Sequence, residues 1–215
     1  MLFINELLSC SLLLIFLDIS IPTQQKHKWV LIHSIVNGFI IGFTIGDTWN
    51  YFTCPIDIHQ SDNAYAVIYV LLLHIYHLTC YTCNRLDYIH HFVMCSLLGL
   101  PLYIQDLEMF GYANFILFFT CGLPGAIDYY NMYRAYNGRI SILQEKKINV
   151  RLNMWIRSPG ILFACVVLWI NMMRGTTSLL YGLPTLFALI WNAQYFAQEV
   201  CISYGKHMAI DLKVI

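Results

Sequence analysis

Long apolar runs separated by short polar segments make up almost the whole chain. Many of the runs approach the roughly 20 mostly apolar residues that a helix needs to cross a bilayer. Helices are the expected form, because a backbone inside lipid must satisfy its own hydrogen bonds. The polar stretch 134–157 predicts a loop with room for an interfacial helix. The pattern thus predicts an all-α, polytopic transmembrane bundle of about seven spans, at residues 2–21, 29–48, 65–84, 88–104, 109–133, 158–173 and 178–204.

Composition supports a membrane protein. Of the 215 residues, 59% are hydrophobic and 11% are charged. Soluble domains carry about 25% charged residues, so these charges are too few to coat a water-soluble globule. The net charge is zero, so we expect no nucleic acid partner. The eight cysteines are scattered singly, mostly in apolar runs, which favours packing roles over a disulfide framework.

Lysine and arginine are distributed unevenly between the two ends of the predicted bundle. Of the 12 such residues, only Arg174 falls on the end that carries the predicted N-terminus. By the positive-inside rule, the other end faces the cytosol, and with it the C-terminus. That end collects Lys26, Lys28, Arg85, Arg134, Arg139, Lys146, Lys147, Arg151, Arg157, Lys206 and Lys213.

Ionisable side chains from four predicted spans share the cytosolic depth of the bundle. Such groups are costly in a membrane and usually face the bundle interior or a cavity. We therefore expect them around one polar pocket that opens towards the cytosol. For His33, a hydrogen bond between helices is an equally ordinary role. The residues concerned are His33, His74, His77, His90, His91 and Asp128.

The stretch DYIHHF, residues 87–92, places an aspartate before two adjacent histidines. Asp87 and His91 are four residues apart, so on a helix the carboxylate can orient the His91 ring. An imidazole exchanges protons near neutral pH. Neighbouring helical residues diverge by about 100°, so we expect His91 to be the chemically active ring. His90 is then expected to brace the bundle by hydrogen-bonding another helix.

Metal sites are weaker alternatives. HIYH and DYIHH look like parts of the histidine boxes of membrane di-iron hydroxylases and desaturases, but the boxes are incomplete and no third one follows His91. Cys80 and Cys83 form a single CxxC, without the second ligand pair of a structural zinc site. We therefore expect no metal and no bound cofactor, and a metal-dependent lipid hydroxylase is the remotest alternative.

Several blocks carry a family resemblance through their order and spacing. They read KWVLIHSIVNGF, DYIHHF, GYANFILFFTCGLPGAIDYYNMYR, NMWIRSPGILF and FALIWNAQYFAQEV, the last with Asn192 opening an N-x-x-(W/Y)-F pattern. Together they resemble the TLC domain family, which includes ceramide synthases, translocation-associated membrane proteins and small TLC-domain proteins. The resemblance covers residues 25–207 and predicts a TLC-like domain there; the apolar pattern adds an N-terminal span at 1–24, and a short tail follows at 208–215.

The resemblance implies a helical bundle around a lipid-binding cavity, with N-acyl transfer from acyl-CoA to a sphingoid-type amine. The segment GLPGAIDYYN lacks the histidine that ceramide synthases carry before their aspartate, so a non-catalytic regulator of membrane composition stays open. Expected partners are membrane lipid and acyl-CoA as co-substrate; a homodimer and an endoplasmic reticulum or other endomembrane location are also open. The catalytic candidates are His90, His91 and Asp128, and the substrate-binding candidates are His74, His77, His33, Asp87 and Asn192.

Overall fold

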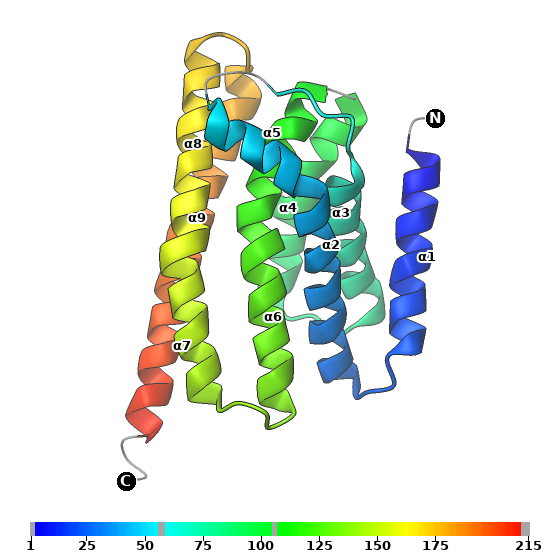
Figure 1. Ribbon diagram of the computed structural model, residues 1–215, viewed down its shortest axis with the longest axis vertical. Helices are drawn as coiled ribbons and strands as arrows, with labels where there is room; N and C mark the ends of the chain where they lie inside the picture. Colours follow the sequence, from blue (N-terminus) through cyan, green and yellow to red (C-terminus); the bar gives the residue numbers. More distant parts are fainter. Residues whose placement is uncertain (1–2, 56–58, 105–106, 212–215) are drawn as a thin grey trace.

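The computed structural model describes residues 3–55, 59–104 and 107–211, and within them the chain is all-helical and has no strand (Figure 1). The predicted all-α class is confirmed. Residues 1–2 and 212–215, at the ends of the outer predicted domains, lie outside the described residues. The elements are α1 (Ile4–Ser20), α2 (Gln25–Thr53), α3 (Tyr65–Cys80), α4 (Arg85–Ile104), α5 (Leu107–Leu117), the π-helical turn η1 (Phe118–Gly122), α6 (Leu123–Tyr136), α7 (Ile142–Leu152), the π-helical turn η2 (Asn153–Arg157), α8 (Ser158–Met173) and α9 (Leu179–Asp211).

The helices run alternately up and down in Figure 1. Joined through η1 and η2, α5 with α6 and α7 with α8 each form one rod, so the described residues make seven rods. The α1–α2 and α6–α7 connections and the C-terminus lie at the lower end, and the N-terminus lies at the upper end. One apolar cluster packs α2 against α1, α3 and α5, and a second packs α5 against α8 and α9.

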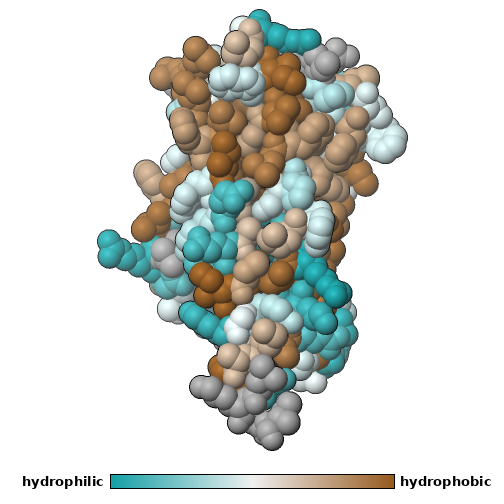
Figure 2. Space-filling view, turned by 90° about the vertical axis from the view of Figure 1, so that its left-hand side faces the viewer, coloured by the Kyte–Doolittle hydropathy of each residue, from teal (hydrophilic) through white to brown (hydrophobic). Residues whose placement is uncertain are grey.

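Three of the described helices are long and apolar enough to cross a membrane: His27–Thr53, Phe110–Tyr136 and Ile142–Met173. Large apolar side chains stand exposed on the outside of the bundle, among them Phe16 and Phe187. Figure 2 shows such residues over the upper part of one face and hydrophilic residues towards its lower end. Apolar surface of this extent requires an apolar environment, so the chain is a membrane protein.

The polar stretch 134–157 is not the loop that the sequence pattern predicts. Its connection covers only residues 137–141, and α7 begins at Ile142. The Ser141 hydroxyl accepts a hydrogen bond from the Gln144 N–H at 3.0 Å and caps the helix. From there α7, η2 and α8 continue without a break to Met173. The short sixth span predicted at 158–173 is therefore the second half of a longer rod.

Each of the two π-helical turns ends two positions before a proline, η1 before Pro124 and η2 before Pro159. A proline has no N–H, and its ring clashes with the carbonyl four residues earlier. The turn ahead of each proline widens, and one N–H bonds to the carbonyl five residues back. These bonds join Leu123 to Phe118 and Ser158 to Asn153.

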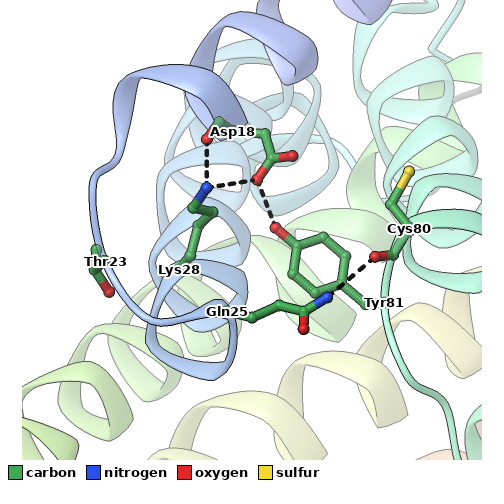
Figure 3. A pocket seen from close by; sticks show the side chains of 6 residues that line it. All are labelled: Asp18, Thr23, Gln25, Lys28, Cys80 and Tyr81. Carbon is green, nitrogen blue, oxygen red and sulfur yellow. Dashed lines mark hydrogen bonds and ion pairs between the residues drawn. The ribbon is translucent and has the colours of Figure 1, made fainter.

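A polar clamp fastens α1 to α2 and α3 around a small pocket (Figure 3). The Tyr81 hydroxyl donates to Asp18 Oδ1 and the Tyr76 hydroxyl donates to Asp18 Oδ2, both at 2.7 Å. Lys28 Nζ lies 3.4 Å from Asp18 Oδ1 and donates to the Asp18 carbonyl at 2.8 Å. Both carboxylate oxygens and the ammonium have partners, so this cluster stabilises the packing of the three helices.

A test of the fold is the close approach of α8 to η1 at Gly160. A Cβ at this position would overlap the buried ring of Phe119. Extra carbon in a packed core costs about 1–3 kcal/mol, so we expect Gly160→Ala to lower the melting temperature in detergent. Gly42→Ala is the control, because nothing lies within 4 Å of a Cβ there. Equal melting temperatures for the two variants would contradict this packing.

Candidate functional site

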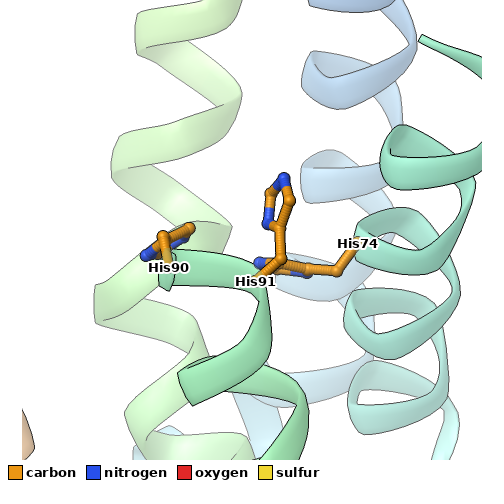
Figure 4. Close-up of side chains that lie close together, drawn as sticks. All are labelled: His74, His90 and His91. Carbon is orange, nitrogen blue, oxygen red and sulfur yellow. The ribbon is translucent and has the colours of Figure 1, made fainter. Parts of the chain in front are cut away.

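The α3–α4 hairpin brings four imidazoles together, which we call the histidine cluster: His74, His77, His90 and His91. Figure 4 shows His74 reaching from α3 towards His91 on α4, with His90 beside them. The ring centroid of His91 lies 4.6 Å from that of His74, 4.9 Å from that of His77 and 5.5 Å from that of His90. His91 is therefore the centre of the cluster, and both His74 and His91 are buried.

Hydrogen bonds fix the orientation of two of these rings. His74 Nδ1 lies 2.6 Å from the Val70 carbonyl oxygen. A carbonyl only accepts, so Nδ1 of His74 carries the proton and its Nε2 is left as an acceptor. His91 Nε2 lies 2.7 Å from His77 Nδ1. The other His91 nitrogen, Nδ1, is buried without a hydrogen-bond partner among the described residues.

His33 on α2 joins the cluster through an aromatic neighbour. The Trp29 ring stacks on His77 at 4.1 Å between centroids and meets His33 edge-on at 5.0 Å. On its other side, His33 stacks against Tyr129 of α6 at 3.9 Å. His33 Nδ1 is buried and has no hydrogen-bond partner in the described part of the chain. His33 is thus held by ring contacts, and the predicted hydrogen bond to another helix is not formed at this nitrogen.

One turn beyond His33, the seam between α2 and α6 holds a second polar side chain. Asn37 is buried, and both its amide atoms lack a partner within the described residues. Gly125 allows the close approach of the helices, because a Cβ there would overlap the Asn37 amide. The Ser34 hydroxyl donates to the Ala126 carbonyl at 2.8 Å beside it. The sequence analysis does not single out Asn37; its spacing of four residues from His33 is the signal that could have found it.

Asp128 interacts with residues of α7 and η2. The charged groups that act on it are Glu145 and Lys146 of α7 and Arg157 of η2, and its Oδ1 is buried without a hydrogen-bond partner among the residues described. Lys146 Nζ lies 2.9 Å from the Glu145 carboxylate. The structure therefore brings the four histidines of the expected pocket together, whereas the charged groups that act on Asp128 come from α7 and η2.

The Asp87 carboxylate acts electrostatically on the His91 ring, but its hydrogen bonds in the described residues are made elsewhere than at His91. The Asp87 carboxylate accepts from the Asn84 N–H at 2.8 Å, and the Asn84 side chain accepts from the Asp87 N–H at 3.1 Å. This reciprocal capping pair begins α4 and points the carboxylate back along the chain. The partner of His91 is another imidazole, that of His77.

The division of roles within the adjacent pair also differs from the expectation. His91 makes the hydrogen bond to a neighbouring helix and is buried. His90 is partly exposed, and its contacts in the described residues are to the rings of His74, His91 and Phe196 of α9. His91 therefore braces α4 against α3 and also carries the unpartnered nitrogen.

Arg157 is the polar residue that sequence reasoning misplaced. The charge pattern predicts it among the cytosolic loop charges, but it lies in η2 inside the bundle. Its Nε donates to the Thr120 carbonyl at 3.1 Å, and its Nη2 donates to Asn192 Oδ1 at 3.0 Å. Thr120 is the residue whose helical partner would have been the missing N–H of Pro124. The Arg157 guanidinium also covers the Phe196 ring at 4.2 Å. An arginine just before Ser-Pro-Gly and an apolar run is the sequence signal for this role.

No family model matches the chain, and no curated protein or solved structure matches it either. The resemblance to the TLC domain family therefore stays a prediction. The site has to be argued from its own chemistry. Four neighbouring imidazoles with free acceptor nitrogens can move protons, bind a polar head group or hold a metal ion.

Arg157 offers a stability test of the site. Arg157→Gln removes the donors to Thr120 and Asn192, and each buried acceptor left unpaired costs about 1–3 kcal/mol. Arg157→Lys should recover little of this, because an ammonium lacks the planar fork of donors. We expect both variants to melt at lower temperature in detergent, whereas Arg151→Gln, exposed on the same rod, should not. A lysine variant as stable as the wild type would show that the fork is not needed.

Proposed function

We propose that this protein is a multi-pass membrane protein that binds and modifies a membrane lipid at the histidine cluster. The observation that carries the proposal is the buried Nδ1 of His91, which has no hydrogen-bond partner among the described residues and is surrounded by three further imidazoles. Buried polar atoms are normally hydrogen-bonded, so this nitrogen is suited to a ligand. Within an apolar bundle, the abundant ligand with a polar group at that depth is a lipid.

The reaction that fits best is acyl transfer from acyl-CoA to the amine of a sphingoid-type lipid. The resemblance of DYIHHF and its flanking blocks to the TLC domain family supports this reaction. In it the amine nitrogen bonds to the thioester carbonyl carbon and the carbon–sulfur bond breaks. The proton lost by the amine ends on the departing thiolate. The histidine cluster supplies the reactive groups, and His91 is the residue on which the reaction depends most.

A second candidate is a non-catalytic lipid-binding protein that regulates membrane composition. The surroundings of Asp128 favour it, because the charged groups that act on this residue, which the resemblance assigns to catalysis, come from α7 and η2. In that case the cluster recognises a polar head group without changing it. Both candidates place the lipid at the same residues.

Acyl transfer is tested with purified protein in lipid nanodiscs, supplied with labelled acyl-CoA and a long-chain amine. We expect an N-acylated product by mass spectrometry. His91→Gln should reduce its formation by at least about 100-fold, in line with the usual contribution of a group that handles protons. His207→Gln is the matched control, because within the described part of the chain His207 bonds to the Ser203 carbonyl on its own helix. Lipid binding that depends on His91, without any product, would support the second candidate instead.

The proposed membrane topology has all seven rods crossing the bilayer, with the C-terminus in the cytosol. The lower end in Figure 1 carries the C-terminus and the α6–α7 connection, which holds Arg139. Basic residues are retained on the cytosolic side of membranes. We expect a tag at the C-terminus to be digested by protease added to intact microsomes, and a tag at the N-terminus to be protected. The reverse pattern would overturn the orientation.

A further inference from the structure

We propose that His74, His90 and His91 bind a divalent transition-metal ion, with zinc as the reference ion. The candidate ligand atoms of these residues, one ring nitrogen from each, all lie within 4.8 Å of one another. Three histidines that leave a fourth position open are a ligand set of catalytic zinc sites. The inference deepens the proposed function, since it names what the cluster holds, but metal binding is measured without any lipid.

The tautomer of His74 is the first supporting observation. A metal-bound histidine almost always donates its other ring N–H to a carbonyl, a carboxylate or water, which fixes the ring and raises its basicity. His74 Nδ1 makes such a bond to the Val70 carbonyl one turn earlier. Its Nε2 therefore carries a lone pair, on the side that faces His91 in Figure 4. A hydrogen bond within α3 therefore holds the His74 ring in the tautomer that a metal ligand needs.

The state of His91 is the second and independent observation. Its Nδ1 is buried and has no hydrogen-bond partner in the described residues. Its Nε2 is paired with His77 Nδ1 at 2.7 Å. If Nδ1 of His91 binds the metal, its Nε2 carries the proton and donates a hydrogen bond to His77. His77 then orients the His91 ring in the same way as the Val70 carbonyl orients the His74 ring. One hydrogen bond thus orients each of the two buried ligands.

His90 completes the set from the more open side. Its ring centroid lies 5.5 Å from those of both His74 and His91. It is partly exposed and makes ring contacts but no hydrogen bond among the residues described. A ring that no such bond holds can turn to close on an ion with metal–nitrogen distances of about 2.0–2.1 Å.

A competing ligand set shares His91 and consists of His77, Cys83 and His91. It is disfavoured because the facing nitrogens of His77 and His91 are already joined at 2.7 Å. An ion there would have to break that bond. The Cys83 thiol donates instead to the His77 carbonyl at 3.5 Å. Cys83 therefore discriminates between the two sets experimentally.

A metal ion at the first set would add a Lewis acid to the site, which can polarise an acyl carbonyl oxygen. His91 would then serve the proposed reaction as a ligand. His77 is a positioning residue, because it acts through the His91 ring. These roles predict graded effects on metal affinity.

The experiment uses the full chain, purified in detergent with a tag that contains no histidine. Metal content is measured by mass spectrometry, and zinc affinity is measured by titration of chelator-treated protein. Cobalt(II) reports the ligand geometry through its visible absorption. We expect one metal ion per chain. Affinity should fall at least about 100-fold in the Gln variants of His74, His90 and His91 and about 10–100-fold in His77→Gln, and it should be unchanged in Cys83→Ser and His207→Gln.

A measurement on the wild type tests metal binding without depending on whether any variant folds. Stripping the ion with chelator should lower the melting temperature of the wild type, and adding zinc should restore it. Absence of metal binding in the wild type, or full binding in His91→Gln, would overturn the proposal. Loss in Cys83→Ser with retention in His74→Gln and His90→Gln would overturn this ligand set in favour of the other. Metal binding without acyl transfer would support the metal site and overturn the proposed reaction. Acyl transfer by metal-free protein would support the proposed reaction and overturn the metal site.

Discussion

Polar atoms inside this bundle can form hydrogen bonds only with the protein itself or with a ligand, since apolar side chains and then lipid surround them. This constraint explains the specific joints between helices. Asp18 with two tyrosine hydroxyls and Lys28 fastens α1 to α2 and α3. Arg157 fastens η2 to η1 and α9. Within the described residues the constraint is not met at His91, His33 and Asn37, which lie in or beside the candidate site, nor at Asn114, Asp128 and Glu145.

Arg157 joins η1, η2 and α9 because a proline leaves a carbonyl of η1 without its helical partner. Pro124 removes the N–H that would have bonded to the Thr120 carbonyl, and that carbonyl accepts from Arg157 instead. The guanidinium then holds Asn192 and lies over Phe196. The Phe196 ring in turn packs edge-to-face with the His90 ring, with 6.1 Å between their centroids. The Thr120 carbonyl freed by Pro124 is thus linked through Arg157 and Phe196 of α9 to the histidine cluster.

The sequence was a good guide to the helices and a partial guide to the site. Apolar runs report burial along a helix, so each of the seven predicted segments overlaps a helix in the described chain. The polar residues of α7 give no apolar run, so the pattern allows only an interfacial helix within a loop there, although Ser141 offers a cap. Histidine depth predicted that α3 and α4 would bring their imidazoles together. It could not show that Asp87 caps its own helix or that α7 and η2 supply the charged groups that act on Asp128, because both depend on side-chain direction and on long-range packing.

The hydrogen bond between His77 and His91 uses Nε2 of His91 and leaves its Nδ1 without a partner in the described residues. A buried polar atom left unpaired costs about 1–3 kcal/mol, and within the described residues His91 Nδ1 is such an atom, beside two further imidazoles. If stability alone had shaped this position, a leucine or phenylalanine would fill it without that cost. Four imidazoles at one depth are also too many for helix packing, since one pair suffices to join α3 to α4. The surplus nitrogens therefore point to a bound group, and the fixed tautomer of His74 favours one that accepts lone pairs.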